Sequence, residues 1–385
     1  MTSSRWRVGT LTTCALGAGL GFYYSFDYIA EGAKKIGGML QAKATASIIA
    51  MIKEEEEGRR LDENLAKIIV NNPAVTSSFL VPLRVAVNQR IKIKKSLKNL
   101  GALKKTGFSD KIAAIDCWKD LRSKSLEHLF VSAYSVTLLH VIGAVVSSTF
   151  GRLSREKADE GTNIGGADTT ISHDDKVEGM KFLVSYFSTS GVNRIHAVVK
   201  KAVEEEMASW ELNEASVNAQ AKQSAFLTVL ERVRSRLETL HFADFVVDRD
   251  ETKFGSDGAS LLVSIVYDVI ESPYSALAIY AMTGAFFDTY EKIVVKRVLF
   301  EDDCESCILG KMLTYMAIAH AKDSIGMFRE GTADGKEENT NEFLLAINSS
   351  KELFSLSRTL YISSVIPSSE CDNEYPTGTV TKEEE

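Results

Sequence analysis

The sequence predicts an all-α protein, an elongated helical bundle around one long central helix with a single N-terminal transmembrane helix. Only five of the 385 residues are proline, and none lies between Leu83 and Ser272. Proline removes a backbone donor and clashes inside a helix, so this stretch and its helical spacing of apolar residues favour helices. An uncharged run from Val8 to Phe26 supplies the membrane helix. The chain is long for one core, but an elongated bundle accommodates that length.

Composition and motifs exclude several classes of function. The net charge of -7 argues against bulk binding of nucleic acid. The five cysteines are scattered and odd in number, which favours a reducing compartment. Cys304 and Cys307 lack the further ligands that tetrahedral zinc requires, so we expect no metal site. No nucleophile elbow, phosphate loop or kinase signature occurs, and we expect no catalytic residues, no cofactor and no enzymatic activity.

Residues 1–33 are predicted to be a membrane anchor. The uncharged run has 19 residues and nearly crosses a bilayer core of about 30 Å. Arg5 and Arg7 precede it, and an aromatic cluster of the kind found at membrane interfaces lies at its other end. A cleaved signal peptide is the alternative, but its apolar region is usually shorter and ends in small residues. An uncleaved anchor is therefore favoured.

Residues 34–366 are predicted to form one soluble helical domain. Its polar helical pattern continues to about Lys67, and after a break at residues 71–73 a basic amphipathic helix follows over about 78–105. A basic cluster lies on it, close in sequence to the anchor: Arg90, Lys92, Lys94, Lys95 and Lys98. One interpretation is contact with anionic lipid headgroups of the membrane surface. The other is a solubilising helix face that balances the acidic run of residues 54–57. The sequence leaves both open.

A long helix is predicted over about 110–153, with Ser109 as its cap. The part that begins at Leu129 and ends at Phe150 is nearly continuous in apolar and small residues, and His140 is its one side chain that titrates near neutral pH. Such a run is long enough for a second membrane span, which would make the chain a polytopic helical membrane protein. Its many hydroxyl side chains instead favour the central helix of a large bundle, which is apolar on all sides.

The rest of the chain continues the helical pattern after a loop over about 155–175. Asp174 and Asp175 stand at a predicted helix start, where carboxylates favour the helix dipole. Further helices are predicted at about 175–188, 191–209, 215–240, 259–270, 274–299, 306–328 and 340–363. Residues 367–385 are polar and acidic, and we expect a disordered tail.

Several stretches in order resemble the peroxin-3 family. The most specific is Cys117-Trp118-Lys119-Asp120-Leu121, which is similar to the segment that opens that family's long central helix. Others are Leu80-Val81-Pro82-Leu83-Arg84, Glu271-Ser272-Pro273 and Leu309-Gly310-Lys311. The resemblance covers most of the chain.

The resemblance implies a docking receptor in the membrane of the peroxisome, or of a related organelle such as the glycosome, with most of the chain in the cytosol. It implies that peroxin-19, the soluble receptor for new peroxisomal membrane proteins, lays its N-terminal amphipathic helix in an apolar groove. By this resemblance the groove is formed by Trp118, Leu103, Lys111, Leu121 and Lys311. Further partners in organelle inheritance or turnover are left open.

Overall fold

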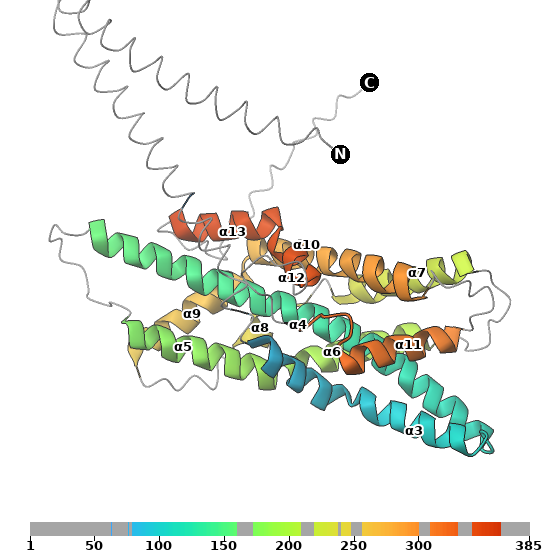
Figure 1. Cartoon of the computed structure of the whole chain (residues 1–385). Helices are drawn as coiled ribbons and strands as arrows, with labels where there is room; N and C mark the ends of the chain where they lie inside the picture. Colours follow the sequence, from blue (N-terminus) through green and yellow to red (C-terminus); the bar gives the residue numbers. More distant parts are fainter. Residues whose placement is uncertain are drawn as a thin grey trace, which may run out of the picture. The chain divides into compact units, whose positions relative to one another are not determined.

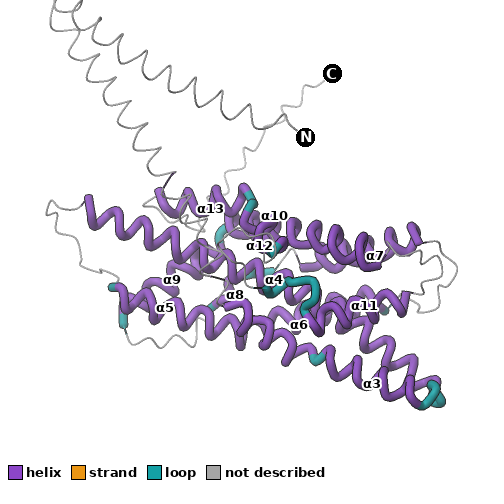
Figure 2. The backbone as a smooth tube through the Cα atoms, in the orientation of Figure 1, coloured by secondary structure: helices purple, strands orange, loops and turns teal. Residues whose placement is uncertain are grey.

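The computed structural model describes residues 63, 76, 79–159, 172–208, 219–237, 240–247, 256–299, 309–329 and 341–362. All of these except Glu63 belong to one compact unit, Asn64–Glu385. Within the described residues all regular structure is helical and no strand occurs (Figure 2). The prediction of an all-α fold is therefore confirmed. The predicted anchor, residues 1–33, and the predicted tail, residues 367–385, lie outside the described residues.

A helical hairpin opens the described part of the unit. Residues 79–91 form its first helix, α3 (Ile93–Lys105) continues it, and α4 (Lys111–Asp159) returns alongside. The predicted single helix over 78–105 is wrong at one residue: Lys92 has a left-handed backbone, with φ 56°, and separates the two helices. Gly107 ends the hairpin's first arm with φ 67°, where a glycine has no steric cost.

Helix α4 is the central helix that the sequence predicts. Its 49 residues span about 70 Å. It is capped by Asp110 and not by Ser109, because Asp110 Oδ1 accepts a hydrogen bond of 2.9 Å from the backbone N–H of Ala113. Every residue from 129 to 146 is buried. This burial favours the central-helix interpretation over a second membrane span.

Two stretches of the described residues pass a test of length and hydropathy for membrane spans. One is the α4 segment Lys111–Arg152, whose most apolar window is entirely buried in the bundle. The other passes only if α9 and the helix after it count as one span, although they bend by 70° at their junction. Core helices of soluble bundles meet the same criterion, so the test does not separate the two cases.

The remaining helices surround α4, and α3, α6, α10, α11 and α13 all pack directly against it (Figure 1). Their bounds are α5 (His173–Tyr186), η1 (Phe187–Gly191), α6 (Val192–Met207), α7 (Ala219–Leu237), α8 (Ala243–Val246), α9 (Asp257–Glu271), α10 (Pro273–Tyr290), η2 (Glu291–Leu299), α11 (Leu309–Lys322), α12 (Glu342–Asn348) and α13 (Lys351–Ile362). The predicted last helix, 340–363, is in fact two helices. The short α8 was not predicted.

Helix starts follow ordinary capping chemistry. At α5, Ser172 Oγ accepts from the backbone N–H of Asp175 at 3.1 Å, and the Asp175 carboxylate accepts from the Ser172 N–H at 2.7 Å. The hydrogen bond from Ser172 lowers the pKa of Asp175. Of the two carboxylates predicted at this start, Asp175 is therefore the one that caps the helix. Ser256 and Ser272 cap α9 and α10 in the same way.

A buried polar cluster lies where α4, α10 and α11 meet. The rings of His128 and His320 stack with centroids 4.9 Å apart, and the Tyr290 hydroxyl lies 3.0 Å from His320 Nε2. His128 also contacts Asn88 Oδ1 and Ser132 Oγ, each at 3.3 Å. Burial lowers the pKa of His128 to about 4, and burial followed by the nearby His128 holds that of His320 well below its usual value. Both imidazoles are therefore neutral at physiological pH, as core histidines.

Candidate functional site

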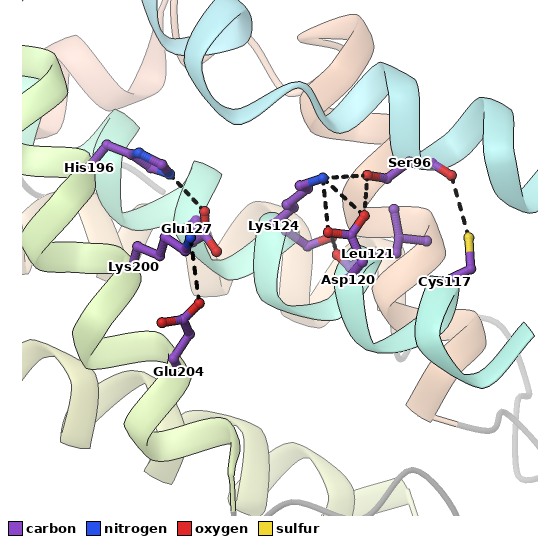
Figure 3. A network of polar contacts seen from close by, with 10 residues as sticks. Ser96, Cys117, Asp120, Leu121, Lys124, Glu127, His196, Lys200 and Glu204 are labelled. Atoms are coloured by element: carbon purple, nitrogen blue, oxygen red, sulfur yellow. Dashed lines mark hydrogen bonds and ion pairs between the residues drawn. The ribbon is translucent and has the colours of Figure 1, made fainter. Parts of the chain in front are cut away.

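Helices α3 and α4 are joined near the tip of their hairpin by a polar network (Figure 3). Ser96 Oγ donates to Asp120 Oδ2 at 2.5 Å, and Lys124 Nζ lies 2.9 Å from both Ser96 Oγ and Asp120. The Cys117 thiol contacts the Ser96 carbonyl at 3.8 Å. Burial, and then the Asp120 charge, raise the pKa of this thiol, which keeps it protonated and able to donate. These contacts hold the part of α4 that carries Trp118 in a fixed position against α3.

The two apolar residues of the Trp118 motif have different positions. Leu121 is fully buried in the core, so it has no surface to offer a partner in this conformation. Trp118 is half-buried and packs against the edge of the same core. Trp118 therefore packs against the core with one part of its side chain and leaves another part accessible. Such a side chain can both support and line a binding surface.

Two isoleucines extend this surface toward the hairpin tip. Ile112 is 75% exposed and Ile115 is 49% exposed, which is unusual for large apolar side chains in an otherwise well-buried helix. Residues 112, 115 and 118 recur every three positions and so lie along one side of α4. We call Ile112, Ile115 and Trp118 the tip stripe. The sequence analysis missed both isoleucines, although their spacing from Trp118 was a readable signal.

The described part of α6 ends close to the tip stripe. Met207 is the last residue of α6, and its carbonyl oxygen accepts a hydrogen bond of 3.1 Å from Arg122 Nη2. Arg122 lies one helical turn after Trp118, so the end of α6 contacts α4 next to the turns that carry the tip stripe. Figure 1 shows the start of α4 and the end of α3 projecting together at this tip.

The other predicted groove residues lie around the tip stripe to different extents. Lys111 is exposed at the first position of α4, and Leu103 is half-buried in the last turns of α3. Lys311 is the third residue of α11, a helix that packs against both α3 and α4, but its side chain is outside the described part of the structure. Trp118, Leu103 and Lys111 therefore share one end of the hairpin.

The predicted basic cluster is divided between two surfaces. Arg90, Lys92 and Lys95 line a polar cleft that also includes residues of α4 and α6. Lys94 and Lys98 are exposed on another side of α3 and do not line this cleft. The sequence could not separate the two groups, because the break at Lys92 changes which residues share a face.

Comparison with known proteins gives no family for the chain. No family model matches it, and a search of curated proteins finds no match. Among the described residues no three His, Cys, Asp or Glu side chains are grouped as they would be around a metal ion, and Cys304 and Cys307 lie outside those residues. The functional argument therefore rests on the geometry of the hairpin tip and on the residue patterns of the sequence.

Proposed function

We propose that this protein is a membrane-anchored docking receptor of the peroxin-3 type, which recruits peroxin-19 and thereby enables insertion of peroxisomal membrane proteins. The observation that carries the proposal is the tip stripe, in which two exposed isoleucines adjoin the half-buried tryptophan of the motif that resembles that family. Exposed apolar patches of this kind commonly mark binding surfaces for other proteins.

The spacing of the tip stripe suits an amphipathic helix as the partner. Ile112, Ile115 and Trp118 span seven residues of α4, or about 9 Å, which is close to two turns of a helix laid against it. Apolar side chains at i, i+3, i+4 and i+7 of such a partner meet a row of this kind in helix-in-groove recognition. The half-buried Trp118 is the natural anchor, since tryptophans often carry much of the binding energy.

Charge at the rim supports an orientation for the partner. Lys111 is exposed at the first turn of α4, one turn before Ile115. A cation at the rim favours an acidic residue on the facing end of a bound helix and mainly affects the association rate and its salt dependence. The proposal places the chain in the peroxisomal membrane through residues 1–33, and the uncharged run from Val8 to Phe26 supports that anchor.

The test measures binding of a fluorescein-labelled N-terminal peptide of peroxin-19 from the same organism to the full-length chain in detergent, by fluorescence anisotropy. We expect Ile112→Ser to weaken binding at least tenfold, because it removes an exposed apolar contact without opening the core. Trp118→Ala should weaken binding further. Trp118 also packs against the core, so the melting temperature of that variant is measured in parallel.

Leu277→Ser is the matched control. Leu277 is 58% exposed on α10, so this variant also replaces one exposed aliphatic side chain by serine, at a position outside the tip stripe. Binding should be unchanged in it. Failure of the parent chain to bind the peptide, or equal losses in Ile112→Ser and Leu277→Ser, would remove the docking proposal.

A further inference from the structure

A polar cleft of about 570 Å³ lies beside the hairpin and is lined by residues 90–99, by residues 119–127 near the start of α4, and by residues 196–204 of α6. Six Lys or Arg side chains and three carboxylates line it: Arg90, Lys92, Lys95, Lys119, Lys124 and Lys200, with Asp120, Glu127 and Glu204. The whole chain carries a net charge of -7, so this excess of positive charge is a local feature. Figure 3 shows part of the cleft wall, with α6 facing α4.

Some of the side chains that line the cleft are buried and hydrogen-bonded to one another. Arg90 Nε donates to His196 Nδ1 at 3.3 Å, and His196 Nε2 lies 2.8 Å from Glu127 Oε2. Because Nδ1 accepts from Arg90, the imidazole proton is on Nε2 and is donated to Glu127. The side chains of His196 and Glu127 are only 10% and 6% exposed. This relay couples the buried Glu127 carboxylate to the Arg90 guanidinium.

The two other carboxylates also have cationic partners. Asp120 pairs with Lys124 at 2.9 Å, and Glu204 pairs with Lys200 at 3.7 Å. Within the described part of the chain, Lys92, Lys95 and Lys119 have no carboxylate oxygen within 4 Å. Three of the ammonium groups that line the cleft are therefore not paired with a carboxylate of the described residues.

The backbone at Lys92 is strained. Lys92 has φ 56° and ψ 35°, a left-handed conformation that a lysine adopts only at a cost. Such strain clusters at functional sites. The break ends one helix and begins the next, and it places Lys92 and Lys95 at the cleft while Lys94 and Lys98 remain outside it.

We propose that this cleft binds a compact ligand that carries two or more phosphate groups, of the inositol polyphosphate class, either free or as the headgroup of a lipid. Three uncompensated lysines supply the point charges that phosphate groups require. Asn99 and Ser123 line the same cleft and supply neutral polar groups. The inference does not depend on the docking function, because the tip stripe contributes no residue to the cleft.

The test uses the full-length chain in detergent and isothermal titration calorimetry at about 150 mM salt, where diffuse surface charge is largely screened. Two probes are titrated: inositol trisphosphate, and dioctanoyl phosphatidylinositol bisphosphate. The cleft variant combines Lys92→Gly, Lys95→Gln and Lys119→Gln, and it should bind at least tenfold more weakly than the parent. Glycine is chosen at 92 because it tolerates the left-handed backbone.

The matched control combines Lys94→Gln, Lys98→Gln and Lys104→Gln. It removes an equal number of positive charges, from exposed positions outside the cleft. It should retain the parent's affinity within about threefold. Equal affinity for both probes assigns the site to a soluble phosphate ligand, and clearly tighter binding of the lipid assigns it to a membrane headgroup. No binding of either probe, or equal losses in the cleft and control variants, overturns the proposal.

Discussion

The stacked pair of His128 and His320 makes stability depend on pH at the level of single residues. An exposed histidine in the unfolded chain titrates near 6.5, whereas burial lowers the pKa of His128 in the folded chain to about 4. Between these values the unfolded chain binds a proton that the folded chain does not, so stability falls as the pH falls through this window. We expect His128 alone to cost about 2 kcal/mol between pH 7 and pH 5.

Chemical denaturation at pH 7 and at pH 5 measures this loss, with His128→Gln as the comparison. Glutamine keeps a hydrogen-bonding group beside Asn88 and Ser132 but does not titrate. The variant should be less stable than the parent at pH 7, yet its loss between the two pH values should be smaller by about 2 kcal/mol. The same pH dependence in parent and variant would show that His128 is not the group responsible.

Single residues also show what the sequence could and could not predict. The resemblance pointed to Trp118, and the structure places that side chain at an accessible edge of the core. The same five-residue motif contains Leu121, which is fully buried. Whether Trp118 or Leu121 is buried depends on which helices flank each side of α4. Such long-range packing cannot be predicted from the local sequence pattern. Ile112 and Ile115 differ in this respect, because their three-residue spacing from Trp118 was a signal that the sequence did contain.

The sequence predicts which segments are helical better than it predicts where those helices are interrupted. The predicted break between 188 and 191 is a π-helical segment, η1, through which the helix continues from α5 into α6. Lys92 breaks a helix although lysine is a good helix former. Neither place has a clear signal in the sequence: η1 packs against α8, and Lys92 is exposed.

The π-helical segment η1 requires a glycine at position 191. This requirement gives a prediction about the stability of that element. A Cβ at Gly191 would collide with the carbonyl oxygen of Phe245, in α8, and would lie 2.9 Å from Phe187 Cδ2. Backbone cannot move aside as a flexible side chain does, so Gly191→Ala should destabilise the fold by about 1–3 kcal/mol. Thermal denaturation followed by circular dichroism measures the change.

Gly101→Ala is the control for that experiment. Gly101 lies inside α3, and a Cβ there would have nothing within 4 Å. Alanine has the higher helix propensity, so this variant should be more stable by up to about 1 kcal/mol. A Gly191→Ala protein with the stability of the parent would show that α8 can move away from η1, contrary to the tight packing described.

At the scale of the whole molecule, the position of α4 determines the other properties. Its apolar half is covered by α6, α10, α11 and α13, which bury the stretch that alone resembled a second membrane span. Its first turns project together with the end of α3 at the hairpin tip, where the two isoleucines of the tip stripe are exposed. One helix thus provides both the core and the candidate docking surface, because its neighbours are shorter than it is.

The burial of α4 leads to a prediction about membrane attachment. If residues 1–33 are the single anchor, their removal should leave a protein that is soluble without detergent, since the apolar window of α4 is entirely buried within the bundle. A chain that begins at Lys34 is expressed and examined by size-exclusion chromatography with light scattering, and we expect a monodisperse species. A matched chain that begins at Met1 should require detergent, because an uncharged run of this length is stable in a bilayer and aggregates in water. If instead the shortened chain also needs detergent, α4 or the bent pair of α9 and α10 contacts lipid. The single-anchor architecture would then be wrong, together with the cytosolic position proposed for the tip stripe.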